Sequence, residues 1–281
     1  MKFALVNGER VEATKSAKGF CPACESELIA RFCVNKVDHW AHKGNRNCDP
    51  WWENETEWHR AWKGQFPTEW QEVVHEADSG ERHIADVKTD QGWVIEFQHS
   101  FLKREERRAR DTFYPQLVWV VDGTRRNRDK SQFENALNGG ASINAKPKIL
   151  SVFTDECALL REWAGCRAPV FFDFAELNKT EGVPLWCLLP ISSDGKVFVL
   201  PFSRAYFIKL HRTGAKQEGL DFAAILKDLN EIVSRYISHI SAQHRRSKVL
   251  NKFAQQRQYR RSRQPESFQQ YLKRTRTGRR F

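Results

Sequence analysis

The sequence lacks any long hydrophobic run. A membrane-spanning helix needs about 20 consecutive apolar residues, and charged residues interrupt the 281-residue chain before that length throughout. The N-terminal residues MKFALVNGERVEA hold only a short apolar run, and no secretory cleavage pattern follows it. Hydrophobic residues make up 40% of the chain and aromatic residues 12%, which is enough for a folded core. We therefore expect a folded cytoplasmic protein without a membrane segment.

An even, regularly spread set of cysteines, which a secreted disulfide framework requires, is also missing. There are seven cysteines, and four of them fall within the first 48 residues. The other three, Cys157, Cys166 and Cys187, are scattered. Clustered cysteines beside histidines in a cytoplasmic chain are more typical of metal ligands than of disulfides.

Acidic residues are almost absent from the C-terminal end. From Arg245 to Phe281 there are 13 Lys and Arg but one acid, Glu266, whereas the rest of the chain holds 33 basic and 34 acidic residues. A charge run is usually a solvated tail. Here aromatic residues interleave with the basic ones, and Lys and Arg displace condensed counterions from nucleic acid. We therefore expect residues 244–281 to form a basic, partly helical tail that binds nucleic acid.

The first half of the sequence predicts an α/β core at residues 51–124. A helix is predicted at 52–66, ending before Pro67, and a second at 102–114, ending before Pro115. Strand patterns occur at 69–76, 82–88, 92–98 and 117–123, and the last is a continuous apolar run of the kind buried on both faces. The order is helix, three strands, helix, strand.

The second half carries no chemical motif. Residues 124–146 are polar and are expected to form an exposed connection to a second α+β region at 147–243. In that region, strands are predicted near 147–153, 169–174, 184–190 and 196–202, and a long helix from about Leu220 to Ile240. Its aromatic residues are expected to form ordinary core: Trp186, Phe198, Phe202 and Tyr206.

Two acids flank a predicted hairpin turn at Asp90-Gln91-Gly92. If the hairpin is centred on Gln91, Asp86 lies directly opposite Glu96. Gln98 projects from the same face, because side chains alternate along a strand. Opposed like charges cost a few tenths to about 1 kcal/mol, and hard Mg²⁺, which prefers carboxylate oxygens, would compensate them. The alternative is an exposed sheet face with two solvated acids, but a hairpin followed by a helix and a buried strand should lie centrally.

Glu55, His59 and Lys63 recur at every fourth position of the first predicted helix and would share one face. Such a stripe is more often a solvated face. Because it directly precedes the hairpin, an acid on this helix could complete a metal site.

The N-terminal residues 1–50 predict a small zinc-binding module. Cys21-x2-Cys24 is a spacing that supplies two thiolates to zinc. His42 and Cys48 are the preferred third and fourth ligands, with His39 as the substitute and Cys33 a further candidate. The alternative is reduced surface cysteines without metal. The segment has few apolar residues, and small loop-rich modules need a staple, so a structural zinc ion is expected.

Taken in order, these motifs resemble the competence protein CoiA family, which is assigned to the PD-(D/E)XK nuclease superfamily. The resemblance covers about residues 15–125. It begins at Cys21-Pro22-Ala23-Cys24 and His39-Trp40-Ala41-His42 and continues through Glu55-x3-His59-x3-Lys63, Arg82-x3-Asp86-Val87, Ile95-Glu96-Phe97-Gln98-x-Ser100, Arg110-x3-Tyr114 and Val118-Trp119-Val120-Val121.

The resemblance implies an αβββαβ nuclease core and a metal-dependent hydrolysis of phosphodiester bonds in DNA, serving DNA processing, recombination, uptake or defence. Asp86 and Glu96 would bind Mg²⁺ (or Mn²⁺), and Glu55 would assist from the first helix. The superfamily usually carries a lysine at the third position, where this chain has Gln98. A glutamine can hydrogen-bond a water but carries no charge.

The sequence also offers candidates for phosphate contacts and two other functions. Ser100, Arg107 and Arg110, on or beside the second predicted helix, are candidates for phosphate contacts. The alternative function is a catalytically inactive nucleic-acid-binding protein that uses the zinc module and the basic tail, and Gln98 is the residue that separates the two. In a third interpretation, residues 147–243 bind a protein partner and the core is a scaffold.

Overall fold

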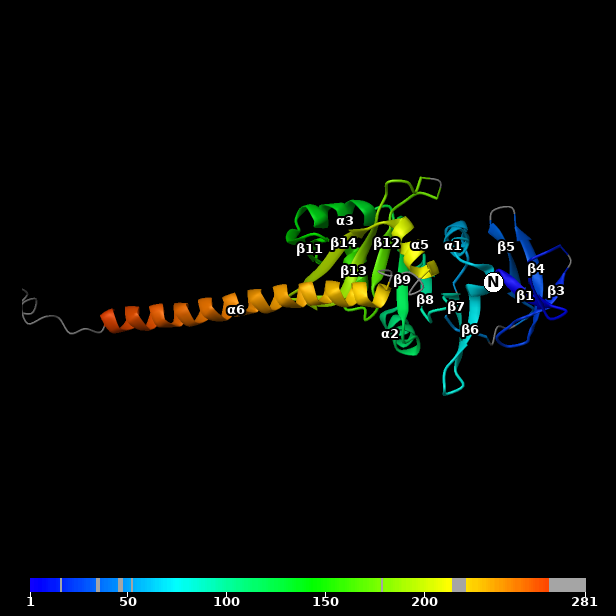
Figure 1. Ribbon diagram of the computed structural model, residues 1–281, viewed down its shortest axis with the longest axis horizontal. Coiled ribbons are helices and arrows are strands. Elements are labelled where there is room, and N and C mark those ends of the chain that lie inside the picture. Colours follow the sequence, from blue (N-terminus) through cyan, green and yellow to red (C-terminus); the bar gives the residue numbers. More distant parts are fainter. Residues whose placement is uncertain are drawn as a thin grey trace, which may run out of the picture. The chain divides into compact units, whose positions relative to one another are not determined.

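The computed structural model describes residues 1–15, 17–33, 36–44, 48–51, 53–177, 179–213 and 221–262. The chain divides into a unit from Met1 to Val233 and a second unit from Ser234 to Phe281. The first unit contains two separate sheets (Figure 1). None of the helices in the described ranges combines the length and the apolar character that crossing a membrane requires.

The N-terminal residues form a five-stranded antiparallel sheet in the order β2-β1-β3-β4-β5. Its core is small, with Ala4, Leu28 and Trp40 nearly inaccessible to solvent. This sheet contacts the rest of the unit where the backbone N–H groups of Lys2 and Phe3 donate to the carboxylate of Glu72. The strands are β1 (Phe3–Val6), β2 (Glu9–Glu12), β3 (Lys18–Phe20), β4 (Glu27–Cys33) and β5 (Lys36–His42).

The remaining strands form one nine-stranded sheet in the order β10-β11-β14-β13-β12-β9-β8-β7-β6. In its centre β8, β9 and β12 are parallel, so their C-terminal ends meet at one edge. All six residues of β9 are buried, as its continuous apolar run predicts. The strands are β6 (Gln71–Glu76), β7 (Arg82–Lys88), β8 (Val94–Gln98), β9 (Leu117–Asp122), β10 (Ala141–Ala145), β11 (Lys148–Phe153), β12 (Val170–Asp173), β13 (Leu185–Ser193) and β14 (Lys196–Phe202).

The helices follow the predicted order around the site. The elements α1, β6, β7, β8, α2 and β9 occur in the expected αβββαβ sequence. The first helix is shorter than predicted, because Thr56 caps it: its side chain accepts from the backbone N–H of His59 and the His59 ring accepts in return. The helices are α1 (Glu57–Lys63), the 3₁₀ turn η1 (Thr68–Trp70), α2 (Arg104–Phe113), α3 (Asp129–Asn138), α4 (Ala158–Trp163), α5 (Arg204–Thr213) and α6 (Phe222–Ser262).

The prediction of an exposed connection at 124–146 is wrong, because this segment contains α3 and β10. Phe133 and Ala136, three residues apart, share a helical face and are buried against the sheet. The segment is polar overall, so its average composition does not indicate this short apolar face.

Residues 147–243 were expected to form a second α+β region. In the structure β11 to β14 continue the same sheet as β6 to β9, joined through the parallel pair of β9 and β12. One hydrophobic core therefore contains residues from both halves, such as Val94 and Val199. Among the four aromatic residues expected in this core, Phe198 and Phe202 are buried and Trp186 is half-buried, whereas Tyr206 is 37% exposed.

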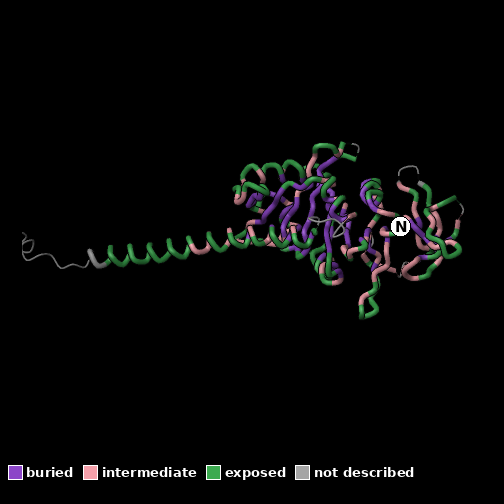
Figure 2. The backbone as a smooth tube through the Cα atoms, viewed as in Figure 1, coloured by how far each residue is buried: buried purple, intermediate pink, exposed green. Residues whose placement is uncertain are grey.

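Helix α6 extends well beyond the predicted end at Ile240. Its first turns bury Phe222, Leu226, Leu229 and Val233, one residue every three or four. Every residue from 243 to 259 is exposed (Figure 2). Residues 263–281 of the predicted basic tail lie outside the described residues.

Candidate active site and metal centre

The hairpin of β7 and β8 has the predicted register. Val87 pairs with Ile95 and Lys88 with Val94, as a hairpin centred on Gln91 requires. The turn closes at Gly92, whose φ of +86° favours glycine. The predicted register is therefore confirmed. Sequence could predict it because the register of a hairpin is set by the local geometry of its turn.

The two hairpin acids line the same pocket. Asp86 Oδ2 accepts from the backbone N–H of Phe97 at 3.0 Å, and the backbone N–H of Asp86 lies 3.4 Å from Glu96 Oε1. Each acid is thus held by the backbone of the opposite strand. The pocket has a volume of about 70 Å³, which holds an ion and a few waters.

Glu96 is a buried residue in the wall of this pocket. Burial raises the pKa of Glu96 to about 8, and the negative charge of Asp86 raises it too, against the effect of the Arg110 guanidinium 2.9 Å away. The Glu96 carboxyl group is therefore poorly compensated as an anion.

Lys63, on α1, supplies a positive charge to the pocket. Its ammonium lies 3.0 Å from Asp86 Oδ1, 3.1 Å from Glu72 Oε1 and 3.2 Å from Glu55 Oε1. Burial alone would lower the pKa of Lys63, but the three surrounding carboxylates outweigh it and raise the pKa well above its usual value. Lys63 therefore remains an ammonium ion that links α1, β6 and β7.

Glu55 does not lie on the first helix, because α1 begins at Glu57. The predicted helical stripe of Glu55, His59 and Lys63 is corrected accordingly. Glu55 lines the pocket, but its carboxylate is paired with Lys63 and with Arg60 Nε at 3.0 Å. A different acid contacts Gln98, the third predicted residue of the hairpin.

That acid is Glu53, which the sequence analysis missed. Its Oε2 accepts from Gln98 Nε2 at 2.7 Å, and its Oε1 accepts from the backbone N–H of Ser100. Burial opposes ionisation of Glu53, but the nearby His59 ring and these Ser100 contacts lower its pKa overall. Glu53 precedes the helix in an irregular segment, so no periodicity in the sequence identifies it.

The predicted phosphate contacts are only partly accessible. Arg107 and Arg110 are buried. Arg107 donates to the Glu162 carbonyl, and Arg110 donates to the Glu96 carboxylate. The prediction that they contact phosphate is therefore wrong, and both residues instead hold α2 in place. Ser100 is exposed, beside Gln98.

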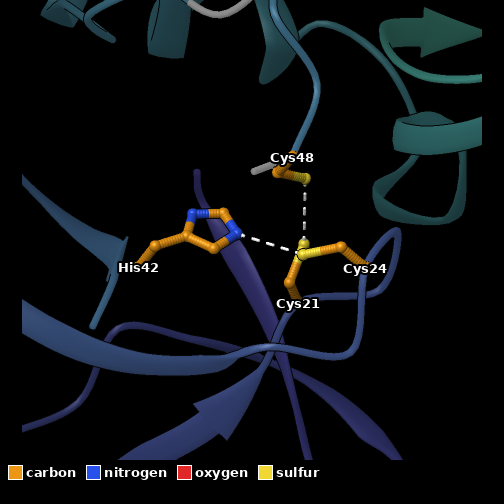
Figure 3. Close-up of side chains that lie close together, drawn as sticks. All are labelled: Cys21, Cys24, His42 and Cys48. Carbon is orange, nitrogen blue, oxygen red and sulfur yellow. Dashed lines mark hydrogen bonds between the residues drawn. The ribbon is translucent and has the colours of Figure 1, made fainter. Parts of the chain in front are cut away.

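A second cluster lies in the N-terminal sheet, where Cys21, Cys24, His42 and Cys48 converge (Figure 3). One ligand atom from each lies within 4.8 Å of all the others. The Cys21 and Cys48 sulfurs are 3.6 Å apart, and Cys24 Sγ is 3.3 Å from His42 Nε2. These separations approach the edge of about 3.8 Å that a tetrahedral zinc site with 2.3 Å bonds to sulfur would have.

The donor set suits a thiophilic metal ion. A hydrogen bond from Cys48 lowers the pKa of Cys21 to about 5, and the same bond raises the pKa of Cys48. A cation bound between the two sulfurs would displace the hydrogen that joins them. Three cysteines and one histidine can hold a metal such as zinc, and they leave no open position for catalysis.

The alternative ligands do not join this cluster. The His39 ring nitrogen Nδ1 lies 2.9 Å from the Val37 carbonyl, and His39 is absent from the converging group. The side chain of Cys33 lies outside the described part of the chain. The preferred ligand set from the sequence is the one that converges.

The cluster is adjacent in sequence to the pocket. Cys48 precedes Asp49, whose carboxylate accepts from the backbone N–H of Ile84 at 2.7 Å and contacts the His83 ring at 2.8 Å. Asp49 thereby attaches the end of the cysteine cluster to β7, the strand that carries Asp86.

Comparisons with known proteins agree with the N-terminal motifs. Residues 5–50 match the family described as competence protein CoiA, N-terminal domain. The chain is similar to CoiA. It is 25% identical over 146 residues to the competence protein CoiA of Bacillus subtilis (strain 168), in an alignment that covers 47% of this chain and 38% of that protein. No solved structure matches the chain.

Proposed function

We propose that this CoiA-like protein is a metal-dependent nuclease of the PD-(D/E)XK type that hydrolyses phosphodiester bonds in DNA. The observation that carries the proposal is the convergence of Asp86 and Glu96 from adjacent strands on one small pocket. A buried carboxyl group beside a second acid is costly unless a cation joins them.

The residues of the pocket fit Mg²⁺ or Mn²⁺, because carboxylate oxygens are the ligands that these hard ions prefer. Asp86 and Glu96 would hold the ion, which when bound polarises a phosphate and acidifies a coordinated water. Lys63 orients Asp86, since its ammonium lies 3.0 Å from Oδ1. Gln98, anchored by Glu53 at 2.7 Å, would position the attacking water through its amide.

The substrate class follows from charge. Between Ser234 and Ser262 the described part of α6 carries eight Lys and Arg and no acid. Such a segment suits the phosphates of nucleic acid. We place the activity in the cytoplasm, in DNA processing, recombination, uptake or defence, and the similarity to a competence protein supports DNA as the substrate.

The test is incubation of the purified protein with plasmid and single-stranded DNA, and RNA in parallel, in the presence of Mg²⁺ or Mn²⁺. Asp86→Ala and Glu96→Ala should each lower the rate by at least about 100-fold. Glu76→Gln is the matched control, because this exposed acid on β6 pairs with Arg82 outside the pocket. Wild-type cleavage that persists in both alanine variants would refute the site.

Gln98 also favours a second candidate, a nucleic-acid-binding protein without catalysis. The uncharged amide occupies the position where the PD-(D/E)XK pattern has lysine. Tight, salt-sensitive DNA binding by a wild-type protein that cleaves nothing with either metal would favour this alternative.

A further inference from the structure

His99 and Asp122 form a pair at the edge of the sheet next to the carboxylate pocket. His99 directly follows β8, and Asp122 ends β9. Because β8 and β9 are parallel neighbours, their C-terminal ends lie side by side. The His99 ring nitrogen Nδ1 is 2.7 Å from Asp122 Oδ2.

Asp122 is fixed and His99 is accessible. The Asp122 side chain is 4% exposed, and its other oxygen accepts from the backbone N–H and the hydroxyl of Thr124, each at 2.7 Å. The His99 side chain is 38% exposed. Since a carboxylate only accepts hydrogen bonds, Nδ1 carries the proton and Nε2 is the atom left for a ligand.

The pair lines a pocket large enough for a substrate. This second pocket has a volume of about 540 Å³, a size typical of ligand sites. It shares Glu55 as a wall with the pocket of Asp86 and Glu96, which is too small for a nucleotide. A nucleic-acid chain bound at the acids would therefore extend beyond the small pocket, and the larger space lined by His99 is its neighbour across Glu55.

We propose that His99 donates the proton to the leaving oxygen when the phosphodiester bond breaks, and that Asp122 is the positioning residue that orients it. The inference rests on the proposed nuclease function. A water oxygen forms the new bond to phosphorus, and the water proton passes to solvent. The bond from phosphorus to the leaving oxygen breaks with its electron pair on that oxygen. The oxygen takes the proton from His99 Nε2, and solvent then reprotonates the neutral ring.

Other charged and titratable groups lie around His99. The backbone N–H of His99 lies 3.4 Å from Glu53, and the His59 ring centroid is 6.1 Å away. Arg125 donates to the carbonyl of the neighbouring Ser100. The walls of the same pocket add the Met1 amino group, His39, Glu55, Glu57 and Glu176. The Asp86 and Glu96 carboxyl groups are not among the partners of His99.

The test uses the full-length protein and oligonucleotides in which sulfur replaces one bridging oxygen, at the 3′ or the 5′ side. A departing thiolate needs no proton, so a proton donor is dispensable for it. With Mn²⁺ in every assay, His99→Gln should lower single-turnover cleavage of the oxygen linkage by about 10²–10⁴-fold. Of the two sulfur linkages, the one that wild type cleaves at sulfur is the informative one. His99→Gln should cleave this linkage at a rate within about threefold of the wild-type rate.

Asp122→Asn gives a second readout. It should lower cleavage of the oxygen linkage and leave cleavage of the sulfur linkage close to wild type, because a misoriented His99 affects only the step that needs its proton. The control is His75→Gln, which changes a histidine that packs against Phe113 and lines neither pocket, and it should leave cleavage of both linkages unchanged.

Each contrary result has one meaning. Equal losses on oxygen and sulfur linkages, or no loss in His99→Gln, would overturn the proton-donor role while the nuclease function stands. A wild-type protein that cleaves no oxygen linkage would instead overturn the proposed function, and the role of His99 with it.

Discussion

At the scale of single residues, burial of Glu96 should make stability depend on pH. The pKa of Glu96 rises from 4.5 to about 8 on folding, through burial first and the Asp86 charge second. The folded protein therefore retains a proton that the unfolded chain loses above pH 4.5. The stability contribution of this group is complete below pH 4.5 and is lost as the pH rises through 8.

Glu96→Gln should remove this loss. Without added Mg²⁺ or Mn²⁺, the melting temperature of the variant relative to wild type should increase between pH 5 and pH 9. A gain of about 1 kcal/mol at the upper end corresponds to roughly 2–4 °C. Thermal unfolding across this range measures the difference, and a gap that stays constant with pH would contradict the assignment.

Replacing Lys63 by an uncharged residue should strongly lower the free energy of unfolding. Lys63→Met leaves Asp86, Glu72 and Glu55 without the buried ammonium that all three contact. Removing one partner of a buried ion pair costs about 3–5 kcal/mol, which urea unfolding would measure. Lys179→Met is the control, since that side chain is 78% exposed in its pair with Glu176 and its loss should leave the midpoint unchanged.

At the scale of elements, the cysteine cluster joins two parts of the N-terminal sheet to the segment that follows it. Cys21 and Cys24 lie in the turn between β3 and β4, His42 ends β5, and Cys48 leads toward the pocket. The core of this sheet is small, so a metal ion here would add cross-links that apolar packing does not supply.

The ligand set can be tested with two neighbouring histidines. Purified wild type should contain close to one zinc ion per chain, and His42→Gln should contain far less. His39→Gln should keep its metal, because its ring contacts the Val37 carbonyl rather than the cysteines. Metal analysis and the visible spectrum of the Co²⁺-substituted protein report both. Equal metal loss in the two variants would point to a different site.

At the scale of the whole molecule, the asymmetry of charge should govern nucleic-acid binding. A variant with Arg245, Arg246, Lys248 and Lys252 changed to Gln removes four charges from exposed positions of α6. The slope of log affinity against log salt should fall by up to about 4 in magnitude. Fluorescence anisotropy on labelled DNA measures it, with the melting temperature as a control. An unchanged slope would show that these four side chains do not bind phosphates.

The parts that sequence could predict are those set by local rules. The turn at Gly92 and side-chain alternation along β8 determine that Asp86 faces Glu96. The spacing of Cys21 and Cys24, with His42 and Cys48 following, identified the cluster that converges. The continuous apolar run of β9 predicted its complete burial.

The missed parts depend on segments far apart in the chain. Glu53 meets Gln98, 45 residues later, only because the segment before α1 lies against the end of β8. His99 meets Asp122 only because β8 and β9 are parallel. Arg107 and Arg110 were expected on the surface, yet α2 lies with both against the core.

The sequence by itself determined the hairpin of acids, the cysteine and histidine spacing and the concentration of positive charge in the last 37 residues, since each depends on residue identity and short-range backbone geometry. Only the tertiary structure decided that β10 to β14 share one sheet with β6 to β9. It also decided which acid accompanies Gln98 and which histidine meets a buried aspartate. Strand order and helix docking minimise the free energy of the whole core, and no local pattern encodes that balance.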